Sequence, residues 1–355
     1  MGTKHARLVR VIAVPLLLAG VAGGVGPVTA ASARTGTSGS AEAFTIRGDL
    51  SGVTATSARN AWAVGVTSSG KTLIAHWNGV AWKRVPSPTP TGGGFLAGVA
   101  ATSARNAWAV GQAHNGTTLI LHWNGRVWKR VPSPTPAHGG DLDAVTATSA
   151  RSAWAVGTTL TGGTAGGLVE RWNGTSWKLV AAPVSEGFAS VTATSPRNAW
   201  AVGFSNKTLI VRWNGTRWSR VHSPSPAGGA VVEGVAAVSA RSAWAVGGTG
   251  STLIVHWNGK AWSREHSPSP AGGAVLIAVA AVSARNAWAA GYTFRGSRTL
   301  ILHWNGTAWK RVSSPSPAGA VLDGVAAASG TSAWAVGRTG SGKTLILHWN
   351  GTAWK

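Results

Sequence analysis

Apolar and polar residues alternate along most of the chain in short runs that turn-forming residues separate. One unit of this pattern reads LxGVAATS, ARN, AWAVG, a variable loop, TLILHW, NGTA, WKRV and PSPTPxGG. Period-two runs rich in Val, Thr, Ile and Trp, bounded by Gly, Pro, Asn and Ser, are typical of β-strands, and no part of the unit has a helical period. We therefore predict four short strands per unit, called strands a, b, c and d in chain order.

The unit occurs seven times, with consecutive copies 44 or 46 residues apart. The tryptophan of its AWAVG element recurs at Trp62, Trp108, Trp154, Trp200, Trp244, Trp288 and Trp334. Between strands c and d every copy has Asn-Gly, the strongest short-range signal for a hairpin turn. Four antiparallel strands repeating at about 45 residues are typical of a β-propeller blade. We predict an all-β fold, a seven-bladed β-propeller over residues 50–355, with blades starting near residues 50, 96, 142, 188, 232, 276 and 322.

Strand b explains how such blades stack. Its alternation places Trp62 and Val64 on one face and Ala61 and Ala63 on the other, so a bulky face can pack on a neighbour's small face. A buried Trp removes about 150–250 Å² from water, so we expect the tryptophans to dominate the core. The a–b and c–d turns have constant length and are predicted on one face of the ring. The b–c loop, which varies, is predicted on the opposite face with the d–a linkers.

The seventh unit reaches only residues 353–355 of strand d. Residues 42–47 alternate like a strand ahead of the first blade, and an open sheet edge is a liability that propellers avoid by closing. We therefore predict that residues 34–49 form a linker with a ring-closing strand that completes the outer edge of blade 7. The alternative is a truncated or larger array.

The N-terminus differs from the repeats. Residues 1–10 are basic, the following run is apolar, and Ala31-Ser32-Ala33 has the form of a cleavage site, so residues 1–33 are predicted to be a signal peptide. We expect a secreted, extracellular, monomeric protein without a membrane span after cleavage. The chain has no Cys, and its net charge is +23. Such a charge attracts polyanions, although it can also serve only solubility and protection of strand edges.

Three sequence elements carry a family resemblance: L-x-G-V, A-W-A-V-G and N-G-x-x-W. Through them residues 50–355 resemble uncharacterised secreted β-propeller repeat proteins of actinobacteria and, more distantly, Asp-box (BNR) and photosystem-assembly-factor propellers. The resemblance implies the fold and no activity, because one propeller scaffold serves many functions. Residues 303–309 lack the Ser and Asp of an Asp-box, and Tyr292 is the only tyrosine. The tyrosine nucleophile of sialidases is therefore not carried over.

Two b–c loops match the P-loop pattern of nucleotide-binding proteins, GVTSSGKT at residues 65–72 and GRTGSGKT at residues 337–344. A P-loop needs a following helix whose N-terminal amides hold the phosphate. Here a strand follows in both places. We therefore interpret both as Gly/Ser/Thr turn sequences and predict no cofactor.

Several repeated positions carry chemistry. Trp77 and Trp82, with six counterpart pairs, either pin the hairpin register or stack on sugars. A histidine in strand c stands a whole blade from the next, which is too far to share a metal ion, so no metal is predicted. An arginine in the a–b turn can hold a polyanion or stabilise its turn. The histidines are His76, His122, His256, His303 and His348, with Arg171 and Arg212 in the other blades; the turn arginines are Arg59, Arg105, Arg151, Arg197, Arg241 and Arg285, with Thr331 in the seventh blade.

Catalysis has few candidates. Asp143, Glu233 and Asp323 occupy the x of L-x-G-V in what we expect to be the innermost strand, where they can point into the central channel. Glycoside cleavage usually needs two carboxylates within about 10 Å, so these three are weak catalytic candidates for a glycan hydrolase or lyase. A channel carboxylate equally suits water, a cation or a nearby arginine.

The function predicted from these features is a non-catalytic extracellular binding module. Its contact surface is expected on the b–c loops and d–a linkers, with anionic polysaccharide or cell-wall polymer as the preferred partner, on charge and Trp content, or else an extracellular protein. A nucleic-acid partner is not expected, because tryptophans buried between blades cannot stack on bases. The ligand-binding candidates are Lys71, His114, Asn115, Lys207, Arg295, Arg298, Arg338 and Lys343.

Overall fold

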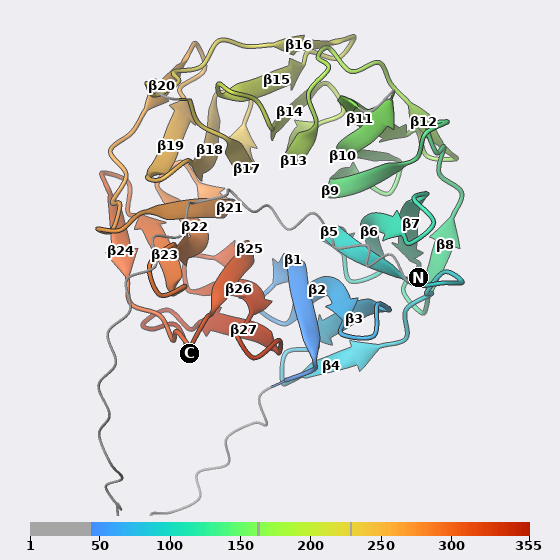
Figure 1. Cartoon of the computed structure of the whole chain (residues 1–355), viewed down its shortest axis with the longest axis horizontal. Coiled ribbons are helices and arrows are strands. Elements are labelled where there is room, and N and C mark those ends of the chain that lie inside the picture. The colour runs from blue at the N-terminus through green and yellow to red at the C-terminus, as the bar shows by residue number, and fades with distance from the viewer. Residues whose placement is uncertain (1–43, 162–163, 228) are drawn as a thin grey trace, which may run out of the picture. The chain divides into compact units, whose positions relative to one another are not determined.

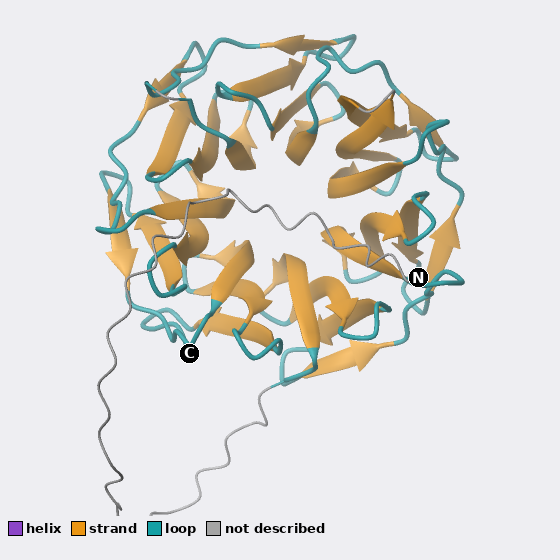
Figure 2. Cartoon of the chain, in the orientation of Figure 1, coloured by secondary structure: helices purple, strands orange, loops and turns teal. Residues whose placement is uncertain are grey.

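The computed structural model describes residues 44–161, 164–227 and 229–355. Seven antiparallel sheets stand around a central axis like the blades of a propeller (Figure 1). The described residues contain strands, turns and loops but no helix (Figure 2). The predicted seven-bladed, all-β propeller is thereby confirmed. The predicted signal peptide, residues 1–33, lies outside the described residues, as does the linker up to residue 43.

Within each sheet the strands follow chain order, and the first strand of every blade lies innermost (Figure 1). Blade by blade, the strands are β1 (Gly48–Ser57), β2 (Asn60–Thr67), β3 (Thr72–Trp77) and β4 (Trp82–Val85); β5 (Gly94–Ser103), β6 (Asn106–Ala113), β7 (Thr118–Trp123) and β8 (Trp128–Val131); β9 (Gly140–Ser149), β10 (Ser152–Thr161), β11 (Thr164–Trp172) and β12 (Trp177–Leu179); β13 (Phe188–Ser195), β14 (Asn198–Gly203), β15 (Leu209–Trp213) and β16 (Trp218–Arg220); β17 (Val232–Ser239), β18 (Ser242–Gly248), β19 (Thr252–Trp257) and β20 (Trp262–Arg264); β21 (Ala274–Ser283), β22 (Asn286–Thr293), β23 (Thr299–Trp304) and β24 (Trp309–Val312); and β25 (Val321–Ser329), β26 (Ser332–Arg338) and β27 (Thr344–Trp349).

Adjacent innermost strands approach one another closely. In every blade the register of strand a slips by one residue at the x of L-x-G-V, which forms a β-bulge. In blade 1 the bulge brings Gly52 against the next blade, where a Cβ on Gly52 would lie 2.8 Å from the carbonyl oxygen of Ala97. A larger side chain at Gly52 would therefore push the two strands apart.

Tryptophan clusters join each blade to the next. Trp62 of β2 stacks on His76 of its own blade, with ring centroids 4.1 Å apart. It also contacts Trp123 and Trp128 of the following blade, at 4.9 and 5.2 Å. The same three-indole arrangement recurs at all seven interfaces and uses all 21 tryptophans. The strand b tryptophans are at most 1% exposed, so they form the core that the sequence pattern predicted.

The two remaining tryptophans of each blade also have structural contacts. Trp77 and Trp82 are cross-strand partners with ring centroids 6.1 Å apart, and both pack on Trp334 of the preceding blade. The interpretation of this pair as a register-pinning contact is confirmed. In addition, Nε1 of Trp77 donates a 3.0 Å hydrogen bond to the carbonyl oxygen of Ala58 in the a–b turn. The equivalent bond forms in every blade, so strand c holds the a–b turn in place.

Both end segments of the described chain lie against β27. Lys355 and His348 exchange two backbone hydrogen bonds of 2.9 Å. Further along the same strand, the amide of Thr344 donates to the carbonyl oxygen of Ile46 at 2.9 Å, and the amide of Ile46 donates to Oγ1 of Thr344 at 3.0 Å. In blade 1 the hydroxyl of the matching Thr72 bonds to the d–a linker instead. Residues 44–47 therefore occupy, in blade 7, the place that the linker has in the other blades.

One ion-pair group also crosses this seam. Nη1 of Arg338, at the end of β26, lies 3.1 Å from Oδ2 of Asp49 in β1 and 3.4 Å from Oδ2 of Asp323 in β25. The first and last blades are thus joined by both backbone and side-chain contacts. None of the described residues forms a helix long and apolar enough to cross a membrane.

We expect the substitution Trp200→Ala to lower the free energy of unfolding by about 3–5 kcal/mol, the usual cost of truncating a large buried aromatic side chain. Trp200 is fully buried and contacts Trp257 and Trp262 of the next blade. Guanidinium chloride unfolding measures the change. Arg197→Ala, in the exposed a–b turn of the same blade, is the control and should change stability by less than about 0.5 kcal/mol. A similar loss in both variants would contradict the role assigned to the indole.

Candidate functional site

The b–c loops and d–a linkers lie together on one face of the ring and are bonded to one another. The amide of Gly94 donates to the carbonyl oxygen of Gly70 at 3.0 Å, and that of Gly140 donates to Gly116 at the same distance. Each of these bonds joins the b–c loop of one blade to the linker that enters the next. The predicted placement of variable loops and linkers on a common face is confirmed. We call this surface the b–c face.

The ligand-binding candidates predicted from sequence come from five blades of this face. Lys71, Lys207, Arg295, Arg298 and Lys343 are exposed. His114 and Asn115 are exposed as well but hold their own loop: Nδ1 of His114 lies 2.9 Å from the carbonyl oxygen of Gly92, and Oδ1 of Asn115 accepts bonds from Thr117. Arg338 is engaged with Asp49 and Asp323. The candidates are therefore dispersed, and three of them already have structural partners.

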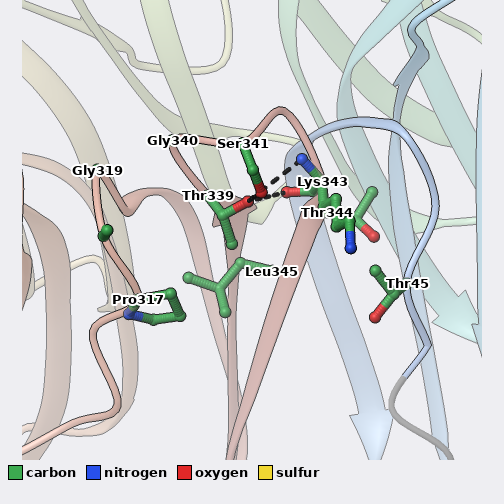
Figure 3. Close-up of a pocket in the computed structure, with 10 residues that line it drawn as sticks. Thr45, Pro317, Gly319, Thr339, Gly340, Ser341, Lys343, Thr344 and Leu345 are labelled. Carbon is green, nitrogen blue, oxygen red and sulfur yellow. Dashed lines mark hydrogen bonds between the residues drawn. The ribbon is translucent and has the colours of Figure 1, made fainter. Parts of the chain in front are cut away.

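The P-loop-like sequence at residues 337–344 lines a shallow pocket of about 610 Å³ at the seam between blade 7 and residue 45 (Figure 3). Most of its amides are already bonded within the protein. Gly340 donates to the carbonyl oxygen of Ala318 at 2.9 Å, Gly342 to that of Thr339 at 3.0 Å, and Lys343 to Oγ1 of Thr339 at 3.2 Å. β27 follows instead of a helix. The donors that a phosphate would need are thus turned inward, which supports the interpretation as a turn.

The three weak catalytic candidates stand in separate blades with different surroundings. Asp323 forms an ion pair with Arg338. This is the alternative in which the carboxylate binds a nearby arginine. Glu233 is only 5% exposed, so it is buried rather than open to solvent. Asp143 is partly exposed in the bulge of β9, and both Asp143 and Glu233 interact with neighbouring groups. Of the three, Asp323 thus has an identified ion-pair partner.

Sequence reasoning missed Glu170, which is fully buried in β11 between blades 2 and 3. The other blades have Ala, Leu or Val at this position of strand c. The one acid at a position that is otherwise apolar was the sequence signal that could have identified Glu170. Oγ of Ser133, in the linker after β8, donates to its two carboxylate oxygens at 3.3 and 3.2 Å. Burial raises the pKa of Glu170 to about 8, and the Ser133 hydrogen bond opposes this shift. At neutral pH the carboxyl group is therefore mostly protonated.

The strand c histidines each stack on the strand b tryptophan of their own blade or lie tilted over it. His76 is typical, with Nε2 2.8 Å from Oδ1 of Asn60. In blades 3 and 4 the arginines take this place: the guanidinium carbon of Arg171 lies 5.0 Å from the Trp154 ring, and that of Arg212 lies 4.9 Å from the Trp200 ring. Burial lowers the pKa of all five histidines. Within the described residues, no three potential metal ligands come together.

The opposite face consists of the a–b and c–d turns and carries the repeated arginines. All six are exposed, and each stem lies over the glycine of its blade's Asn-Gly turn. In blade 1, a Cβ on Gly79 would lie 3.1 Å from Cβ of Arg59. The a–b turn is held instead by Ser57, whose Oγ accepts from the amide of Arg59 at 3.2 Å, and by Trp77. Within the described residues, the guanidinium groups themselves donate no hydrogen bond to their turns, and the arginine contributes to its turn through its backbone amide.

Comparisons with known proteins identify the fold. No protein-family profile matches the sequence, and no curated protein matches it. Among solved structures it is similar to YCF48 bound to D1 peptide, with a TM-score of 0.60 and 16% identity over 86% of this chain and 95% of the other. YCF48 from Cyanidioschyzon merolae is similar with a TM-score of 0.59 and 18% identity, over 85% of this chain and 96% of the other. The GH74 xyloglucanase from Xanthomonas campestris is similar with a TM-score of 0.63 and 16% identity, over 87% of this chain and 53% of the other. At 16–18% identity, these likenesses show the β-propeller fold and nothing beyond it.

We expect Glu170→Gln to remove part of the pH dependence of stability. Folding raises this pKa from 4.5 to about 8, so the folded state retains the proton between these values and the free energy of unfolding falls as pH rises across them. The slope from one such group is at most about 1.4 kcal/mol per pH unit. Glutamine keeps the shape and cannot ionise, so the variant should gain stability over the wild type as pH rises, up to about pH 8.

Unfolding midpoints in guanidinium chloride between pH 5 and 9 test this expectation. The histidines, whose pKa values burial lowers, contribute a slope of opposite sign in both proteins and cancel in the difference. Glu186→Gln, at a partly exposed position in a d–a linker, is the matched control and should show no such gain. Parallel pH profiles for wild type and Glu170→Gln would show that Glu170 ionises normally.

Proposed function

We propose that this protein is a secreted, non-catalytic propeller that binds an anionic extracellular polymer, namely an acidic polysaccharide or cell-wall polymer. The observation that carries the proposal is the surplus of exposed cations. The chain has 32 Lys and Arg against 9 Asp and Glu, so most cations have no acid to pair with. Such a surface attracts polyanions, and salt screens this attraction. The proposed binding is therefore electrostatic and should weaken as the salt concentration rises.

Tryptophan content does not add to this proposal. The sequence suggested sugar stacking as one use of the indoles, but their rings pack on other rings at the blade interfaces. Recognition of a glycan would therefore rest on its charged groups. This is the reason to prefer an acidic polymer over a neutral one.

The alternative of a glycan hydrolase or lyase has weaker support. One structural neighbour is a xyloglucanase, which favours the alternative only at the level of the fold. Two of the three carboxylates that the alternative could use are occupied or buried, since Asp323 pairs with Arg338 and Glu233 is 5% exposed. Asp143 is the third, and it is partly exposed. A protein partner is a further possibility, because YCF48 was solved with a peptide.

We expect the purified protein to be retained on immobilised polygalacturonate at low salt and released as sodium chloride approaches 1 M, where the Debye length falls to about 3 Å. Neutral dextran should not retain it at any salt concentration. Absence of retention at low salt, or retention that salt does not change, would contradict the electrostatic proposal. Turnover of any member of a glycan panel that Asp323→Ala abolishes without unfolding would favour the enzyme alternative.

A further inference from the structure

We propose that the anionic polymer binds to the face formed by the a–b and c–d turns, which we call the arginine face, and not to the variable b–c face. This inference rests on the proposed function and assigns its site. The arginine face carries nine exposed cations, which are Arg59, Arg105, Arg151, Arg197, Arg241 and Arg285 in the a–b turns and Arg126, Arg217 and Lys260 in the c–d turns.

Charge is segregated between the two faces. Of the acids in the described residues, five lie where strand a begins beside the b–c loops, two lie in d–a linkers, and Glu170 is buried in the core: Asp49, Asp141, Asp143, Glu233 and Asp323; Glu186 and Glu265; and Glu170. None lies in an a–b or c–d turn. The cations of the arginine face are therefore unopposed, whereas acids stand among those of the b–c face, and Arg338 is paired with two of them. A surface of one sign concentrates a ligand of the other.

The turn arginines are free to bind. Within the described part of the chain, their guanidinium groups donate no hydrogen bond and join no ion pair. Their stems nevertheless rest on the turn glycines, at 3.1–3.4 Å from where a Cβ would stand. Such support limits the rotamer entropy lost on binding, and a guanidinium presents two parallel donors to a carboxylate, sulfate or phosphate.

The arrangement favours a glycan over a membrane or a nucleic acid. Peripheral membrane binding uses protruding Trp, Phe or Leu side chains, and single-stranded nucleic acids bind through exposed aromatic platforms. The large exposed hydrophobic residues on this face are Val80, Val127 and Val282. The strand c tryptophans beneath it donate their indole N–H to a–b turn carbonyls and pack against other rings. Recognition is therefore by charge, which suits a flexible acidic polysaccharide.

The test compares two triple variants that remove equal charge from opposite faces. Arg105→Gln/Arg151→Gln/Arg197→Gln neutralises three adjacent blades of the arginine face. Lys71→Gln/Lys207→Gln/Lys343→Gln neutralises three exposed lysines of the b–c face. Affinity for polygalacturonate is measured at low salt, with 30-nucleotide single-stranded DNA and anionic phosphatidylglycerol vesicles as the other two probes. Unfolding midpoints verify that both variants fold, and Arg→Lys at the same three positions supplies a variant that retains charge.

We expect the arginine-face variant to lose about tenfold in affinity and the b–c-face variant less than about twofold, since each exposed charge contact is worth little alone. The Arg→Lys variant should lose less affinity than the Arg→Gln variant, because lysine keeps the charge but lacks the paired guanidinium donors. A larger loss in the b–c-face variant would overturn the assignment of the face and leave the proposed function standing. No binding of wild-type protein to polygalacturonate would overturn both, and tighter binding to DNA or vesicles would overturn the choice of glycan.

Discussion

The structure depends on one contact, in which the strand b indole of each blade is buried against the strand c and strand d indoles of the next. A single blade cannot make this contact, since the partner rings belong to its neighbour. Stability is therefore a property of neighbouring pairs, as in other repeat proteins, and the last pair forms only if the ring closes. At the seam Trp334 meets Trp77 and Trp82 in the same geometry as elsewhere, while residues 44–47 and Lys355 take up the outer edge of β27.

This core also determines what the surface can offer. The strand c indole that packs between blades donates its N–H to the a–b turn, so the turn that carries each arginine is positioned by the core itself. The length of that turn is constant for the same reason. The b–c loops lack this constraint and vary in length, although they bond to the linkers. A rigid, repeated and charged face is thus a direct consequence of the sevenfold packing.

Much of the fold was predictable because each local signal recurs seven times. Asn-Gly, the alternation of strand b and the spacing of AWAVG all predict the same blade, and the strand following GRTGSGKT argues against a P-loop. What the sequence could not provide were contacts between repeats. Arg338 and Asp49 are 289 residues apart, and Ser133 meets Glu170 only because two blades stack. The burial of Glu233 is also not readable from its own strand, since Asp143 and Asp323 occupy the same bulge position and are partly exposed.

The net charge of the chain overstates the charge that is available to a ligand. The strand c position that holds a histidine or an arginine shows why. The slot beside each strand b indole accepts a histidine in five blades and an arginine in two, because both side chains are planar and can pack against an indole face. Arg171 and Arg212 are each held between two indoles, and Arg212 also donates to Oδ1 of Asn198, so these cations serve the core. Among the residues that the structure describes, the a–b turn arginines have no indole face and no acid beside them. Their position, rather than the total of +23, is therefore what makes one face of the ring suited to an anionic partner.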